Sequence, residues 1–218
     1  MPDRSLRAAV APAAFALLTA GLLTACGTDT AADTPAAGTP ATTKAPASAA
    51  PATPAVKAAG SLGGPKTACA LPVSFTLAAD WEPKAVEVPE DSEFAELARK
   101  GPATMRCEVD AKPAGNIGFL RVWTAPKGTK ARAALEGFVG AELKPSDVVY
   151  RDVKGGALPA VEVTYALADL DDGTMPRRAF AVDSPQGAVI VHLGGLDAQE
   201  HREMLPAYEL ARTSVTLP

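Results

Sequence analysis

Histidine and cysteine are scarce in this sequence, and their scarcity removes most of the common catalytic and metal-binding chemistries. There are two histidines and three cysteines in 218 residues, with no Cys-x-x-Cys pair and no histidine cluster. Metal sites are typically built from such ligands at short spacing, so no metal is predicted. The Gly-x-Ser-x-Gly, Ser-x-x-Lys and His-Glu-x-x-His patterns of common hydrolases are also missing. We therefore expect neither an enzyme nor a bound cofactor.

Positive charge is also in short supply. The net charge is −4, and the acidic excess lies after residue 66, where 22 acidic side chains accompany 16 basic ones. Nucleic-acid binding needs a basic surface, so no nucleic-acid partner is predicted.

A membrane-spanning apolar run is missing, but a shorter one lies near the N-terminus. Arg4 and Arg7 precede an apolar stretch over 8–23, which is shorter than the roughly 20 residues that span a bilayer. The following Thr-Ala-Cys-Gly segment, 24–27, resembles the lipobox of bacterial lipoproteins. Residues 1–25 are thus predicted to be a lipoprotein signal peptide, and Cys26 the site of lipid attachment. The alternative is an ordinary signal peptide followed by a chance cysteine.

Lipid attachment at Cys26 fixes the expected location. One acyl chain binds a membrane only marginally, whereas a diacylglyceryl group with a further palmitate anchors a protein stably. We expect an extracytoplasmic protein held on the outer face of the cell membrane through its lipid.

Large apolar side chains are nearly missing from residues 26–66. Val56 and Leu62 are the only large aliphatic residues in this Ala-, Thr- and Pro-rich stretch, which has no aromatic residue. Such a segment cannot bury enough apolar area to offset its ordering entropy, so it is predicted to be a disordered tether. Whether the tether is glycosylated stays open.

Residues 67–218 have the composition of a single folded domain. Cys69 and Cys107 form an even pair in an oxidising compartment, which predicts a disulfide; two unpaired buried thiols are the alternative. Period-two patterns predict strands at 73–77, 84–88, 104–110, 117–123, 148–153, 160–167, 177–182 and 188–193. Helical patterns cover 92–100, 130–144 and 198–212. This order predicts an α+β domain, mostly antiparallel sheet with helices packed on it.

Three segments carry a resemblance to a known family. They are the strand 73–77 leading into Asp80 and Trp81, the segment 156–165 (Gly-Ala-Leu-Pro-Ala-Val-Glu-Val-Thr-Tyr), and the end, 208–215. Together they resemble the PsbP/Mog-like α/β/α sandwich domains, especially the LpqN/LpqT-type lipoproteins of actinobacteria. The resemblance implies a binding or assembly domain without catalysis, and it implies no particular ligand.

Four residues inside apolar strands are the best candidates for a ligand site. Arg121, Glu162 and His192 are polar where burial is expected, and buried charges tend to be paired or functional. If they face one side of the sheet, they could line a small site with Trp123. The alternative is an open sheet face that turns polar residues to water. His201 is expected on the solvated face of a helix.

Three functional hypotheses follow. The first is a tethered binding or scaffold lipoprotein of the cell envelope that meets an envelope partner. The second is a small-molecule-binding accessory lipoprotein. The third, a hydrolase with an unrecognised site around His192, has the least support because no nucleophile accompanies that histidine in a known pattern.

Overall fold

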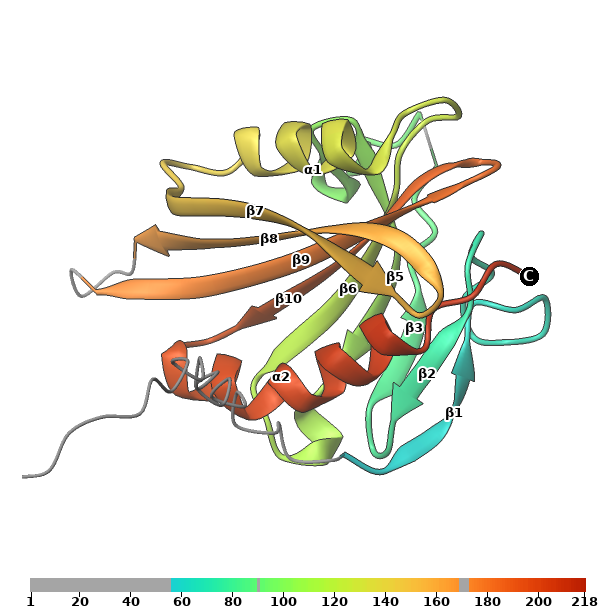
Figure 1. The fold of residues 1–218 in the computed structure, drawn as a ribbon, viewed down its shortest axis with the longest axis horizontal. Coiled ribbons are helices and arrows are strands. Elements are labelled where there is room, and N and C mark those ends of the chain that lie inside the picture. The colour runs from blue at the N-terminus through green and yellow to red at the C-terminus, as the bar shows by residue number, and fades with distance from the viewer. Residues whose placement is uncertain (1–55, 90, 169–172) are drawn as a thin grey trace, which may run out of the picture. The chain divides into compact units, whose positions relative to one another are not determined.

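The computed structural model describes residues 56–89, 91–168 and 173–218 (Figure 1). They belong to one compact unit, Ala49–Pro218. Cys26, the signal peptide predicted at 1–25 and the tether up to residue 55 lie outside the described residues, so those interpretations stay predictions.

An antiparallel sheet of eight strands forms the centre of the domain. Its strand order is β3-β5-β6-β10-β9-β8-β7, and the short β4 pairs with β5. The strands are β3 (Glu82–Ala85), β4 (Arg99–Lys100), β5 (Ala103–Asp110), β6 (Gly118–Thr124), β7 (Ser146–Gly155), β8 (Leu158–Ala168), β9 (Thr174–Ser184) and β10 (Gly187–Gly195). A separate antiparallel pair consists of β1 (Ala58–Leu62) and β2 (Phe75–Ala78).

Helices cover both faces of the large sheet. Figure 1 shows α1 (Ala131–Gly140) over one face and α2 (Ala198–Thr213) against the other, beside β1 and β2. Two short 3₁₀ helices, η1 (Ala95–Ala98) and η2 (Lys112–Ala114), complete the described elements. The predicted α+β class, with a mostly antiparallel sheet and packed helices, is confirmed. None of the helices in the described ranges is long and apolar enough to cross a membrane.

Each face of the sheet has its own apolar core. Leu120 and Val122 of β6 pack in the core under α2, with Tyr208 of that helix. Trp123, the next residue along β6, packs in the core under α1 with Phe138. Because both faces are buried, strands such as β10 read as nearly continuous apolar runs rather than as alternating ones.

The disulfide predicted between Cys69 and Cys107 is confirmed. Both residues are fully buried, and the bond joins positions 38 residues apart. It fastens the segment between β1 and β2 to β5. In the chain-entropy model, closing a loop of this length contributes about 3–4 kcal/mol to stability.

The first described residues correct the predicted extent of the tether. β1 falls within the range 26–66, and it pairs with β2 along Ala58–Leu62. Leu62 is only 1% exposed. The folded domain therefore begins before residue 67, and its first strand is held by pairing with β2 and by the burial of Leu62.

Two predicted helices are shorter than expected. Within 92–100 the one helix described is η1, and the segment ends in β4, while Phe94 and Leu97 are 57% and 76% exposed. With these side chains in solvent, the segment has no apolar face to hold a longer helix on the domain. The helix predicted over 130–144 ends at Gly140, before Lys144 adopts a left-handed backbone with φ of 50°.

Candidate functional site

Arg121 and His192 lie opposite each other on neighbouring strands. They are register partners between β6 and β10, so their side chains project from the same face of the sheet. Trp123 follows two residues after Arg121 and shares this face, which α1 covers. Three of the four predicted ligand-binding residues therefore share one side of the sheet.

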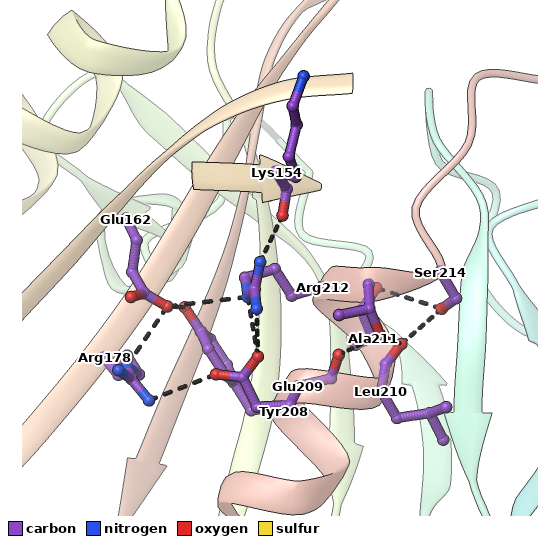
Figure 2. Close-up of polar contacts among 10 residues, drawn as sticks. Lys154, Glu162, Arg178, Tyr208, Glu209, Leu210, Ala211, Arg212 and Ser214 are labelled. Carbon is purple, nitrogen blue, oxygen red and sulfur yellow. Dashed lines mark hydrogen bonds and ion pairs between the residues drawn. The ribbon is translucent and has the colours of Figure 1, made fainter. Parts of the chain in front are cut away.

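Glu162 lies on the other face, so the condition for a site shared by all four residues is not met. On β8 it is the register partner of Phe180, which packs in the core under α2. Glu162 is 6% exposed and accepts a hydrogen bond of 2.9 Å from the Tyr208 hydroxyl (Figure 2). The Nε of Arg178 lies 3.3 Å from the same carboxylate.

The Glu162 carboxylate belongs to a charge network that fastens the end of α2 to the sheet (Figure 2). Arg178 also meets Glu209 at 3.4 Å, and Glu209 binds Arg212 at 2.5 Å. Arg212 donates in addition to the backbone oxygen of Lys154 on β7. Two guanidinium groups balance two carboxylates here, so this arrangement explains helix packing rather than ligand binding.

A chain of polar side chains lies on the α1 face and ends at His192. Glu142 Oε1 accepts from Lys100 Nζ and from the Tyr165 hydroxyl, both at 2.8 Å. The Tyr165 oxygen lies 3.1 Å from His192 Nε2. A carboxylate can only accept, so the tyrosine proton is directed at Glu142 and His192 Nε2–H donates to the tyrosine oxygen. Neutral His192 then has an unprotonated Nδ1.

Burial and neighbouring charges fix the protonation states of His192 and Tyr165. Burial lowers the pKa of His192 well below its usual range, and the positive charges of Lys100, Arg177 and Arg121 lower it further. Burial also raises the pKa of Tyr165, reinforced by the Glu142 carboxylate. At neutral pH the imidazole is therefore uncharged and the phenol protonated.

Trp123 has a packing role beside these hydrogen-bonded side chains. It is 4% exposed, and its ring centroid lies 5.3 Å from that of Phe138. Lys100 Nζ lies 5.7 Å from the Trp123 centroid and 4.8 Å from the Phe138 centroid. The two rings thus hold the lysine ammonium by cation–π attraction.

An open pocket of about 350 Å³ lies where this polar chain meets the ends of β6, β9 and β10. Arg121 and His192 both line it, so the structure brings these two predicted residues to one site. The other lining residues are Lys100, Ile117, Gly118, Phe119, Glu142, Leu167, Arg177, Gly194, Gly195 and Leu196. Lys100 pairs with Glu142 at 2.8 Å and Arg121 pairs with Glu108 at 2.6 Å, so the charges of these two cations are compensated. This pocket is called the β10 pocket below.

His201 is buried, contrary to the expectation of a solvated helix face. It is 6% exposed near the start of α2, and its Nδ1 has no hydrogen-bond partner in the described part of the chain. Burial lowers its pKa to about 4, together with the charges of Arg177, Arg178 and Arg202. α2 begins on the core because Asp197 caps it, accepting from the backbone N–H groups of Gln199 and Glu200.

Other features of the described residues are weaker candidates. A wider groove, about 740 Å³, is lined mainly by prolines and small residues, with Arg106 as its one charged side chain among the described lining residues. Among residues 56–89, 91–168 and 173–218, no group of three or more His, Cys, Asp or Glu side chains could hold a metal ion.

Sequence reasoning missed three residues that line the β10 pocket, Lys100, Glu142 and Arg177, and Tyr165 beside it. Arg177 could have been found, because it lies on β9 beside Gly194 of β10, two residues from His192. Tyr165 is likewise the register partner of Arg177. The contact between Lys100 and Glu142 joins residues 42 positions apart, and no local pattern reports it.

Residues 39–215 match the profile of a protein family described as an uncharacterised lipoprotein. The chain belongs to this lipoprotein family. Among solved structures, this lipoprotein is similar to the solution structure of cyanobacterial PsbP (CyanoP) from Synechocystis sp. PCC 6803. That similarity has a TM-score of 0.44 at 10% sequence identity, over 67% of this chain and 87% of the other. Comparison with curated proteins gives no match.

Membership identifies the chain as a protein that is anchored to a membrane through lipid. The matched range contains every strand and helix described above. The β10 pocket therefore lies on the folded domain of a membrane-anchored lipoprotein.

Proposed function

We propose that this lipoprotein is anchored through Cys26 on the outer face of the cell membrane and binds a small ligand without catalysis. The observation that carries the proposal is the β10 pocket, where Arg121 and His192 meet Lys100 and Arg177. A pocket with a few convergent polar groups and a buried titratable residue is typical of a binding site. This favours the small-molecule-binding hypothesis over a protein scaffold.

The chemistry of the pocket supports binding over hydrolysis. No serine, threonine or cysteine is among the described residues that line it. His192 Nε2 is already bonded to Tyr165, and that histidine stays neutral because it is buried among cations. Cys69 and Cys107 are consumed by the disulfide. A nucleophile beside a base, which hydrolases need, is not assembled from these residues.

Two sequence features support the anchoring. The segment 24–27 resembles a lipobox, and the chain's family is a lipoprotein family. The resemblance to LpqN/LpqT-type lipoproteins points to an actinobacterial cell envelope as the setting. Residues 26–55 then separate the lipid from the pocket-bearing domain.

Two measurements test the proposal. Mass spectrometry of the membrane fraction should find acylated Cys26 at the mature N-terminus, and Cys26→Ser should release the protein from that fraction. Thermal unfolding against a metabolite panel should show stabilisation by at least one compound. Turnover of a substrate that His192→Ala abolishes would overturn the non-catalytic part, and a Cys26→Ser chain that stays anchored would overturn the lipid part.

A further inference from the structure

We propose that the β10 pocket binds a small uncharged apolar molecule that carries a hydroxyl group, and that this hydroxyl donates a hydrogen bond to Nδ1 of His192. This inference rests on the proposed function, because it names the ligand class of the same pocket. Three observations carry it: an acceptor nitrogen on a buried ring, charged lining residues that already have partners, and apolar side chains around the opening.

The Nδ1 atom of His192 is the acceptor that the pocket offers to a ligand. His192 is 4% exposed, and its Nε2–H donates to the Tyr165 oxygen at 3.1 Å, which leaves Nδ1 unprotonated in the neutral ring. None of the described residues donates to this nitrogen. An acceptor that is buried without a donor costs free energy. A ligand that closes the pocket over Nδ1 must therefore supply the donor itself.

A glycine beside the ring gives a ligand access to that nitrogen. Gly194 lies two residues after His192 on β10 and therefore on the same face of the sheet. A Cβ atom at Gly194 would meet Cε1 and Nδ1 of His192, at 3.4 and 3.9 Å. The missing side chain leaves an opening against the Nδ1 edge of the imidazole, and both residues line the pocket.

The charged side chains that line the pocket already have partners. Lys100 and Arg121 are each paired with a carboxylate, at 2.8 and 2.6 Å. Arg177 Nη1 donates to the backbone oxygen of Gly195 at 3.0 Å. A charged ligand would have to leave water without gaining an unpaired counter-charge from these residues, which costs free energy. A carboxylate would in addition bring no proton to the histidine. These conditions favour an uncharged donor.

Apolar side chains around the opening describe the rest of the ligand. Phe119 is the register partner of Gly194 and projects from the same face of the sheet. Leu167 also lines the pocket, and both side chains are half-buried. Ile117 and Leu196, at the edge, are 51% and 57% exposed. An apolar body laid against these residues removes their surface from water, which favours a hydrophobic molecule over a polyol.

The size of the pocket limits the ligand to a small molecule. A volume of about 350 Å³ lies at the small end of the range for ligand sites, roughly 300–1,000 Å³. One ring with a short alkyl group suits this volume. The compound para-ethylphenol has that form, and its hydroxyl, like that of tyrosine, keeps its proton at neutral pH.

Calorimetry with para-ethylphenol tests the inference on the full lipidated chain in phosphatidylcholine nanodiscs, with empty nanodiscs as the blank for partitioning into lipid. We expect saturable binding, and binding about tenfold weaker for para-ethylanisole, in which a methyl group replaces the hydroxyl proton. This preference should vanish in His192→Phe, which keeps a ring but has no acceptor. The para-ethylbenzoate anion and the para-ethylbenzylammonium cation should both bind more weakly than the phenol.

Two glycine variants test the location of the site. Gly194→Val fills the opening without changing any charge and should abolish binding of para-ethylphenol. Gly140→Val adds the same side chain at the exposed end of α1, where a Cβ atom would meet no atom within 4 Å, and should bind like the unaltered chain. Urea denaturation establishes that each variant folds. If Gly194→Val does not fold, nitrogen-15 NMR of the unaltered chain decides, because para-ethylphenol should shift the Nδ1 resonance of His192.

Each contrary result overturns a stated part of the inference. Equal binding of the phenol and the anisole, a preference that survives in His192→Phe, or an unshifted Nδ1 resonance would overturn the hydrogen bond. Tighter binding of either charged probe would overturn the uncharged class, and binding retained in Gly194→Val would overturn the location. Absence of binding by every probe, alongside stabilisation by another compound of the metabolite panel, rejects this inference and leaves the proposed binding function standing; absence of both rejects the two together.

Discussion

At the scale of single residues, the orientation of one side chain decides whether it belongs to the pocket. Arg121, Trp123 and His192 share a face because positions two apart on a strand, and register partners on neighbouring strands, project together. The sequence alone did not allow the rule to be applied to Glu162, since β8 has buried residues on both faces and its apolar pattern gives no direction. The sequence could reveal that Glu162 was unusual, but not which core it served.

Tyr165→Phe tests the polar chain at its centre. The hydroxyl connects Glu142 to His192, and its removal leaves the buried Nε2–H of His192 without an acceptor. We expect the free energy of unfolding to fall by about 1–3 kcal/mol in urea denaturation. Tyr150→Phe is the control, because the Tyr150 ring packs against Arg132 and the change keeps that contact; a loss as large as that of Tyr165→Phe would contradict the assigned role.

The buried histidines predict how stability depends on pH. His201 has a folded pKa of about 4, below the value of about 6.5 in an unfolded chain. The unfolded state therefore takes up the proton first, so stability is complete above pH 6.5 and is lost as the pH falls. Between pH 6.5 and 5 this histidine should cost about 1.5 kcal/mol. Denaturant titrations of His201→Leu should show a decline smaller by that amount, and an unchanged decline would refute the assignment.

At the scale of elements, long and strongly patterned segments were predictable and short ones were not. The strands 104–110, 117–123 and 188–193 and the helix 198–212 agree with β5, β6, β10 and α2 to within a few residues. The helix expected at 92–100 does not form at that length, because the Phe94 and Leu97 side chains are exposed and do not pack on the domain. Tertiary packing, rather than local propensity, decides such short segments.

The attachment of α2 to the sheet gives a prediction at this scale. Glu162→Gln keeps the shape and an acceptor for Tyr208 but removes the charge that faces Arg178. The expected loss of unfolding free energy is about 1.5–3 kcal/mol, as for hydrogen bonds to charged groups. Glu136→Gln breaks the half-exposed pair with Arg132 and should change stability by less than about 0.5 kcal/mol. Equal effects of the two variants in parallel urea titrations would show that the Glu162 network adds nothing.

At the scale of the whole molecule, the boundary between tether and domain was the hardest feature to predict. A composition rich in Ala, Thr and Pro extends past residue 56 into β1, so composition alone placed the domain's start too late. The signal that could have located the domain's start is Leu62, a large apolar residue ahead of the predicted boundary at residue 67. Its burial requires a partner strand. The disulfide at Cys69 then holds this early segment to β5.

Leu62→Ala tests whether β1 is an integral part of the folded domain. Leu62 is 1% exposed in the core under α2, where it packs with residues from distant parts of the chain. Truncation of a buried leucine leaves a cavity and removes transfer free energy, so the loss should be about 2–4 kcal/mol. Leu143→Ala makes the same chemical change at a position that is 82% exposed and should cost less than about 0.5 kcal/mol. If thermal and urea unfolding of the full chain show no difference between the two variants, β1 does not contribute to the core. If they differ as expected, β1 belongs to the folded domain and the predicted tether ends before residue 58.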